Sequence, residues 1–496
     1  MFQGSRVPTF EGSRFQVGTL DPGTLELWNF LFGEAFVTKT VMAFAMLLVP
    51  ALALAQSPTR FKVPVEYFTL PNGLKVVVSE DRSAPVVLVE VMYNIGFRIE
   101  PKGRTGFAHL FEHMMFQGSK QVKKMEHVSV MQQAGGVVNG STRLDYTNYF
   151  QVLPSNALEL ALWLEADRMR SLDVSGENLK NQQDVVSEEV RVNVLNQPHA
   201  SFEWLDIWQR ANTNWYNAHN FYGDLAELEA ATLEDVQKFF QTYYAPNNAV
   251  LVVVGDTTVA DVRKMAEKHF GSIPKQPLPP PADVSEPAQK ESKHSAREDK
   301  LARTPALAIG WHLPERMTKD FFALSVLDPL IVGDESSRLY QKLVRQDRLA
   351  VSVIGAFNFL GNNWDVKGPM LFTMRVDYLN DKNAQQVLDA IESVLTEVKT
   401  KGITEAELTQ AKTALRSSFL EDLEGGFMPR FGRANLMAAF ALFDNDPHRI
   451  NAILDELDKV TVADVKAAAE RWFVPANRTS IDSRPIAKPT VEGGQR

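Results

Sequence analysis

The sequence predicts an α/β (α+β) fold made of two related domains, each a mainly antiparallel sheet flanked by helices. Three observations lead to this prediction. Strand-like and helix-like segments are mixed from residue 63 onward, a stretch rich in proline and charge divides the chain, and a motif of the first half recurs in the second. At 496 residues, the chain is long enough for two domains with complete hydrophobic cores.

Composition narrows the classes of function. Hydrophobic residues make up 45% of the chain and charged residues 23%, which is ordinary for a soluble globular protein. The net charge of −9 argues against nucleic acid as a partner, because phosphate binding needs clustered lysine and arginine. The chain has no cysteine, so disulfides, thiolate chemistry and a lipoprotein anchor are excluded.

Residues 1–55 are predicted to be an N-terminal extension followed by a signal peptide at about 37–55. The apolar run 41–54 follows a single lysine and ends in the small-residue pattern Ala-Leu-Ala. This run is too short for a membrane-spanning helix, which needs about twenty residues. The alternative is a short membrane anchor or a buried helix.

Signal peptides lie at the extreme N-terminus, so this position is unusual. A true start at Val37 or Met42 would explain it. We therefore expect a periplasmic mature chain that begins at Gln56 and has no stable membrane span.

The first domain is predicted over residues 62–271. The expected strands are 65–70, 74–80, 86–94 and 146–153, and the expected helices are 156–169 and 175–195. The glycine- and threonine-rich segment 135–142 precedes one of these strands. It could form an exposed edge strand that pairs with a peptide, and the alternative is an ordinary hairpin.

The stretch 106–118, GFAHLFEHMMFQG, contains the pattern H-x-x-E-H. In a helix, His109 and His113 lie one turn apart on the same face and can both bind one zinc ion. Glu112 lies about 100° away around the helix, where it reaches a water molecule without being a ligand. This is the inverted order of the H-E-x-x-H zinc motif, and the alternative is a helix with two core histidines.

A catalytic zinc ion needs a third protein ligand and one open position. Spacing alone leaves this ligand undecided among the carboxylates and four histidines: His127, His199, His219 and His269.

Residues 64–256 resemble the N-terminal domain of the M16 (pitrilysin and mitochondrial-processing-peptidase) metallopeptidases. The blocks that carry the resemblance are GFAHLFEHMMFQGS, GGVVNGSTRLDYTNYF, LWLEADRMRSL, NQQDVVSEEVR and DVQKFFQTYYAPNNAVLVVVGD. It implies that the third zinc ligand is the glutamate 76 residues beyond His113, which is Glu189. Asn139, on the family's substrate-pairing strand, is carried over as a substrate contact. Many members have an acidic residue seven positions before the ligand, where this chain has Gln182, so a carboxylate is lost there.

Residues 272–304 are rich first in proline and then in charge, and we expect them to be an extended linker. Beyond them, the pattern that spans Thr232 to Pro246 recurs from Thr461 to Pro475. The expected strands 305–311 and 370–376 and helices 321–331, 384–399 and 405–423 repeat the order of the first half. We therefore predict a second, duplicated domain over 305–486 and a tail over 487–496.

The second copy has lost the metal-binding residues. In the alignment of the two halves, Leu324 falls opposite His109 and Asp328 opposite His113. We expect that this domain binds no zinc and that it closes over the substrate. The resemblance implies a clamshell that encloses a chamber.

In the M16 family, a block like residues 332–340 precedes an arginine and a tyrosine that hold the substrate carbonyl. Arg345 matches the arginine, although an ordinary surface arginine is the alternative. Val351 stands where the tyrosine is expected, and loss of such a donor typically costs roughly 10²–10³ in rate. Either Tyr340 or another group replaces it, or a homologous M16 subunit supplies the pair in a heterodimer.

The resulting hypothesis is a zinc-dependent endopeptidase that cleaves short or unfolded peptides inside a chamber as the catalytic subunit of a heterodimer. A self-dimer is the other possible assembly. The alternative function is a structural, assembly or peptide-binding subunit of the same fold, without turnover.

Overall fold

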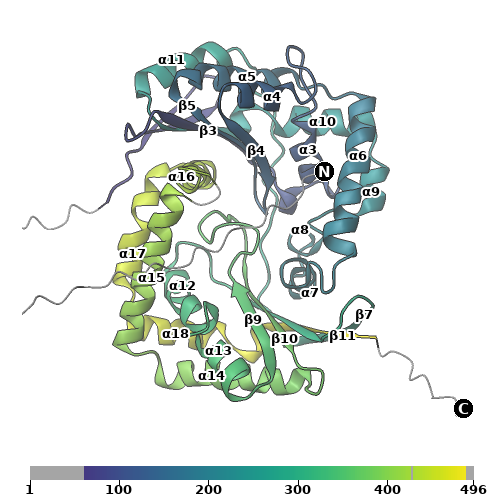
Figure 1. Ribbon diagram of the computed structural model, residues 1–496, viewed down its shortest axis with the longest axis vertical. Coiled ribbons are helices and arrows are strands. Elements are labelled where there is room, and N and C mark those ends of the chain that lie inside the picture. The colour runs from purple at the N-terminus through teal and green to yellow at the C-terminus, as the bar shows by residue number, and fades with distance from the viewer. Residues whose placement is uncertain (1–60, 426–427, 487–496) are drawn as a thin grey trace, which may run out of the picture. The chain divides into compact units, whose positions relative to one another are not determined.

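The protein is described here by a computed structural model that covers residues 61–425 and 428–486, and it contains two β-sheets (Figure 1). The first sheet consists of β1 (Glu66–Thr69), β2 (Lys75–Glu80), β3 (Val86–Tyr93), β4 (Val137–Thr142), β5 (Thr147–Pro154) and β6 (Ala249–Gly255). The second consists of β7 (Lys293–Asp299), β8 (Ala306–His312), β9 (Ala350–Ala356), β10 (Leu371–Tyr378) and β11 (Arg478–Pro485).

The two sheets have the same topology. The strand order is β1-β2-β6-β3-β5-β4 in the first sheet and β7-β11-β8-β10-β9 in the second. Without β1 the two orders correspond strand for strand, and each sheet has one parallel pair, β2 with β6 and β7 with β11. The remaining pairs are antiparallel, so the predicted fold class and the internal duplication are confirmed.

Helices flank both sheets, as predicted. In the first half these are α3 (Phe107–Met114), α4 (Glu126–Gln133), α5 (Leu158–Ser171), α6 (Gly176–Val190), α7 (Ile207–Ala211), α8 (Trp215–Ala218), α9 (Leu225–Glu229), α10 (Leu233–Tyr243) and α11 (Val259–Phe270). In the second half they are α12 (Lys319–Val332), α13 (Arg338–Tyr340), α14 (Ala384–Lys401), α15 (Glu405–Glu424), α16 (Phe431–Phe443), α17 (Ile453–Lys459) and α18 (Val462–Trp472).

The recurring sequence motif has a structural reason in both halves. Thr232 and Asp235 form a capping box at the start of α10, and Thr461 and Asp464 form the same box at the start of α18. In such a box each side chain accepts a hydrogen bond from the other residue's backbone N–H, which fixes where the helix begins. Each helix is followed by a short proline-initiated turn and then a strand, β6 or β11.

The segment 272–304 is not entirely the extended linker that its composition predicts. Its last third contains β7, which pairs in parallel with β11 and is the counterpart of β2. His294 is exposed on this strand, with Nδ1 3.0 Å from the Ser480 hydroxyl. The second sheet therefore begins within this segment. The composition did not reveal the strand, because a polar, alternating strand at a sheet edge resembles a charged linker.

Each half of the chain contributes a helix to the other half's sheet. Helix α16 packs against β2, β3 and β6, and Figure 1 shows it beside the sheet that contains β3, whereas α7 packs against β8 and β11. One hydrophobic cluster accordingly contains Val252 of β6, Ile309 of β8 and Leu436 of α16. The two halves thus share a core, because each sheet buries one face under a helix from the other half.

The predicted extension and signal peptide over 1–55 and the predicted tail over 487–496 lie outside the described residues. Among the residues that are described, no helix is both long and apolar enough to span a membrane.

Candidate metal centre

The helix α3 carries the H-x-x-E-H motif and is anchored at its first turn. Gly106 precedes it with a positive φ of 85°, and a Cβ there would lie 3.1 Å from the Cα of Gly223. The carboxylate of the buried Glu100 accepts hydrogen bonds from Gly106 N at 2.8 Å and Ala108 N at 2.6 Å. A carboxylate at a helix N-terminus satisfies otherwise unpaired N–H groups and complements the helix dipole. Glu100 therefore fixes the position of the helix that carries both histidines.

The structure brings His109, His113 and Glu189 together. The two histidines lie one turn apart on α3, with ring centroids 4.9 Å apart, and Glu189 reaches them from α6. Glu189 Oε1 lies 3.5 Å from His109 Nε2, and Glu189 Oε2 lies 3.3 Å from His113 Nε2. Within residues 61–425 and 428–486, this is the one group of three or more histidine, aspartate or glutamate side chains whose spacing could hold a metal ion.

The donor atoms fit a zinc ion in kind and in spacing. Ligand atoms that surround zinc tetrahedrally at roughly 2.0–2.1 Å lie about 3.3–3.4 Å from one another. The observed N···O distances of 3.3 and 3.5 Å match that separation. They are longer than a typical charge-assisted hydrogen bond of about 2.7–2.9 Å. Two imidazoles and one carboxylate form a known set of ligands for catalytic zinc.

The electrostatic field at the cluster favours a cation. The contacts with the two histidines hold the pKa of Glu189 well below its usual range. Burial alone would lower the pKa of His109, but the neighbouring carboxylates of Glu189 and Glu112 raise it overall. The cluster therefore keeps negative charge close to the two imidazoles.

Glu112 lies beside the cluster but is not one of the three clustered side chains. It projects from α3 toward β4, where the Thr142 hydroxyl donates a hydrogen bond of 2.8 Å to Glu112 Oε2. Thr142 is the last residue of β4. The edge strand thus orients the one carboxylate of the motif that would not bind metal.

Tyr222, which the sequence did not mark as a site residue, holds the carboxylate of Glu189, the third predicted ligand. Its hydroxyl donates a hydrogen bond of 2.9 Å to Glu189 Oε1, and its ring centroid lies 4.9 Å from that of His109. Burial and the nearby Glu189 carboxylate raise the pKa of Tyr222. No spacing rule marks this tyrosine in the sequence, because it comes from a loop beyond α8.

The four histidines left open by spacing have other partners. His127 lies 3.2 Å from Gln151 Oε1, and burial lowers its pKa to about 3. His199 contacts the Thr304 carbonyl, His219 contacts the Phe97 carbonyl, and His269 contacts the Glu159 carboxylate. The structure therefore places Glu189, and none of these four, beside His109 and His113.

The two predicted substrate contacts lie in different halves of the chain, Asn139 on a strand and Arg345 in the helical segment Gln341–Gln346. Asn139 is exposed on β4, and its Oδ1 accepts a hydrogen bond of 2.9 Å from the backbone N–H of Gly140. Among the described strands β4 pairs only with β5, so it is an edge strand as predicted. Arg345 follows α13, has a side chain that is 56% exposed, and forms a 2.8 Å ion pair with Glu335. Gln182 is buried on α6, where its Nε2 donates to Asn181 Oδ1.

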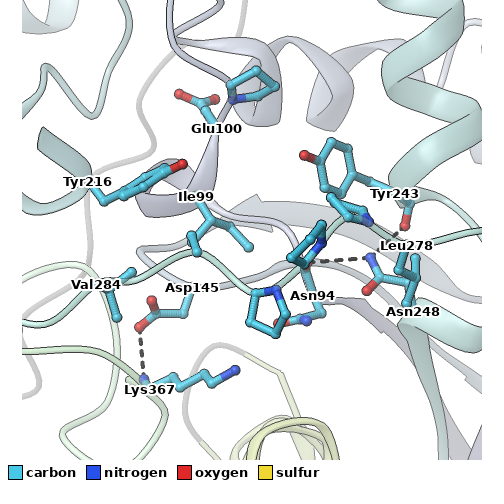
Figure 2. Close-up of a pocket in the computed structure, with 15 residues that line it drawn as sticks. Asn94, Ile99, Glu100, Asp145, Tyr216, Tyr243, Asn248, Leu278, Val284 and Lys367 are labelled. Carbon is cyan, nitrogen blue, oxygen red and sulfur yellow. Dashed lines mark hydrogen bonds between the residues drawn. The ribbon is translucent and has the colours of Figure 1, made fainter.

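A cavity of about 410 Å³ is lined by Glu100, which binds the start of α3, but the metal cluster does not line it. Figure 2 shows Glu100 and Tyr216 on one side of this cavity and Tyr243 on the other, with a proline-rich segment across it. The Asp145 carboxylate and Lys367 also line it and are joined by a hydrogen bond.

The duplicated sheet domains and the matching family models place the chain in a protease-type family. The chain belongs to peptidase family M16. The model of the family described as "Insulinase (Peptidase family M16)" matches residues 75–213, which include the H-x-x-E-H helix and Glu189. The model described as "Peptidase M16 inactive domain" matches residues 230–415.

Relatives of the chain are named zinc proteases. The zinc protease PqqE of Helicobacter pylori is 28% identical over 458 residues, which is 91% of this chain and 99% of that protein. The uncharacterised zinc protease YmxG of Bacillus subtilis is 25% identical and covers 82% of this chain and 96% of its own length.

Solved structures share the fold. A protease from Helicobacter pylori, 28% identical, superposes with a TM-score of 0.78 over 85% of this chain and 100% of that chain. An M16 inactive domain from Pseudomonas fluorescens, 19% identical, has a TM-score of 0.75 over 86% of this chain and 98% of its own. The first half of the periplasmic protease PqqL from Escherichia coli, 18% identical, has a TM-score of 0.68 over 86% and 93%.

Proposed function

We propose that this chain is a zinc-dependent endopeptidase whose metal ion is held by His109, His113 and Glu189. The observation that carries the proposal is the spacing of these three donors, with Glu112 beside them and outside the ligand set. The names of the relatives support the choice of metal and the class of reaction.

Zinc bound at this cluster would polarise the scissile carbonyl and lower the pKa of a water molecule. Glu112 takes the proton of the attacking water and returns it to the leaving amine nitrogen. The Thr142 hydroxyl occupies Oε2 of that carboxylate, so Oε1 is left to accept the proton. Tyr222 holds Glu189 in place and takes no proton in this scheme.

The substrate is a short or unfolded peptide. β4 exposes one edge of its backbone next to Glu112, and an extended peptide can add to such an edge through main-chain hydrogen bonds. Asn139 is exposed on this strand and contacts the peptide. A folded protein has no free extended segment that could pair with β4, so the substrates are restricted to peptides. These peptides are cleaved inside a chamber between the halves.

A second subunit completes the enzyme. Arg345 is exposed and paired with Glu335, and Val351, at the position expected for tyrosine, is 55% exposed on β9. A homologous M16 subunit with the arginine and tyrosine pair would supply the missing donor, and a self-dimer is the other assembly. The signal-like sequence at 37–55 and the periplasmic protease among the structural relatives support export to the periplasm.

The direct test is cleavage of an internally quenched, unfolded peptide by the full chain, alone and mixed with homologous subunits. We expect cleavage that a chelator abolishes and that added zinc restores. Cleavage that is insensitive to chelator would contradict the proposal. A zinc-loaded chain that binds the peptide but never cleaves it, with or without a partner, would instead favour a peptide-binding or assembly subunit.

A further inference from the structure

The loop of residues 357–370, which joins β9 to β10, is anchored on the first half of the chain. Two charged side chains of the first half, Arg98 and Asp145, contact it, and their exposed fractions are only 0% and 5%. A buried charge is strongly destabilising unless its hydrogen bonds are satisfied, so the contacts of this pair constrain its neighbours closely.

Arg98 and Asp145 form hydrogen bonds with three backbone groups of the loop. Arg98 Nε donates to Asp145 Oδ1 at 2.7 Å, and Arg98 Nη2 donates to the Pro369 carbonyl at 2.9 Å. The second carboxylate oxygen, Asp145 Oδ2, accepts from Lys367 N at 2.8 Å and Gly368 N at 3.2 Å. Figure 2 shows the Lys367 contact beside the cavity. The pair therefore holds the loop through its main chain, with little dependence on the loop's side chains.

One path leads from this contact to Glu112 through β4. Asp145 lies in the short connection between β4 and β5, and the hydroxyl of the next residue, Tyr146, donates a 2.8 Å hydrogen bond to Asp365 of the loop. Three residues before Asp145 is Thr142, whose hydroxyl holds Glu112. Movement of the loop would therefore move the connection that sets the position of Thr142.

A second path leads to the start of α3. Arg98 lies in the helical turn Phe97–Ile99, directly before Glu100. Glu100 binds the first backbone N–H groups of α3 at Gly106 and Ala108. Both paths thus end on the helix that carries Glu112, one at its N-terminus and one at the carboxylate itself.

We propose that Arg98 and Asp145 are positioning residues through which the second half of the chain sets the orientation of Glu112. This inference rests on the proposed function, in which Glu112 handles the proton. The degenerate half then has a role in turnover as well as in covering the substrate. Docking of the loop aligns Glu112, and a displaced loop leaves the metal ligands in place but Glu112 misaligned. A misplacement of about 1 Å can cost on the order of 10² in rate.

The test variant is Gly368→Ala, because a Cβ at Gly368 would lie 2.7 Å from both Cζ and Nε of Arg98. The matched control is Lys367→Ala, which shortens the adjacent side chain but keeps the backbone N–H that binds Asp145. For Gly368→Ala we expect kcat to fall about tenfold or more, with KM within about twofold and zinc content unchanged. The control should stay within about twofold of the wild type in both constants.

Hydrogen exchange provides a readout that does not depend on activity. Amides of the β4–β5 connection should exchange faster in Gly368→Ala than in the wild type or in Lys367→Ala. Unchanged exchange there would overturn the proposal. If the wild type does not cleave peptide, the proposed function fails, and this exchange comparison still decides whether the loop holds the connection. If Gly368→Ala does not fold, Tyr146→Phe removes one anchor and should show the same effects to a smaller extent.

A double-mutant cycle tests the path itself. Thr142→Val removes the hydroxyl that holds Glu112 and should lower kcat by itself. If Gly368 acts through Thr142 and α3, then Gly368→Ala should lower kcat by less in the Thr142→Val background than in the wild type. Fully additive effects on kcat would show independent action and contradict the inference.

Discussion

The hydroxyl of Tyr222 donates a 2.9 Å hydrogen bond to Oε1 of Glu189, the same oxygen that lies 3.5 Å from Nε2 of His109. A hydrogen bond of this kind orients a metal-binding carboxylate, and its loss typically costs about 10–100-fold in metal affinity. We therefore predict that Tyr222→Phe weakens zinc binding by about 10-fold or more, measured by competition with a chromogenic chelator.

Tyr216→Phe is the control for this prediction. Tyr216 lies in the same part of the chain, but it lines the cavity of Figure 2 and not the metal cluster. Equal zinc affinity in Tyr222→Phe and the wild type would show that Glu189 is held without this hydrogen bond.

Glu112→Gln should separate metal binding from turnover. Glutamine keeps the size of the side chain and can still interact with the Thr142 hydroxyl, but it cannot take a proton from water. We expect unchanged zinc content and a loss of peptide cleavage of about 10² or more. A variant that retains more than a few per cent of wild-type activity would rule out Glu112 as the general base.

Asp328 of α12, which the sequence alignment places opposite His113, should make stability depend on pH. Burial raises its pKa to about 7, and its Oδ1 has no hydrogen-bond partner among the described residues. Because the pKa is raised in the folded state, the stability contributed by the neutral carboxyl is present in acid and is lost as pH rises through about 7. Asp328→Asn stays neutral and should therefore melt at a higher temperature than the wild type at pH 8.

The size of this effect follows from the shift in pKa. A carboxyl pKa raised to about 7 corresponds to up to about 4 kcal/mol in the free energy of unfolding. The advantage of Asp328→Asn should be much smaller near pH 4 than at pH 8, which melting curves at the two values would measure. An equal difference at both values would show that ionisation of Asp328 is not its cause.

The sequence predicted the features that local patterns determine. The H-x-x-E-H spacing placed two histidines on one face of α3, and the pattern that recurs from Thr232 and from Thr461 indicated the duplication. The family resemblance, and not spacing, selected Glu189. The strand β3, which has a strong apolar pattern, spans Val86–Tyr93, within one residue of its predicted limits of 86–94.

Features that depend on tertiary contacts were not predictable. Tyr222 and Thr142 act on the site only because the fold brings a loop and a strand end against α6 and α3. β7 was hidden in a charged segment, because an edge strand needs little hydrophobic sequence. Helices α7 and α16 each pack against the sheet of the other half, and no local sequence pattern predicts this. An apolar helix pattern does not specify which sheet the helix covers.

The measurement that tests the central claim most directly is the zinc content of the purified full chain and of two neighbouring glutamine variants on α6. Glu189 faces the two histidines, whereas the side chain of Glu188 is 68% exposed and lies near Arg191. We predict about one zinc ion per chain in the wild type and in Glu188→Gln, and little or none in Glu189→Gln. A wild-type chain without zinc, or full zinc content in Glu189→Gln, would contradict the proposed metal centre.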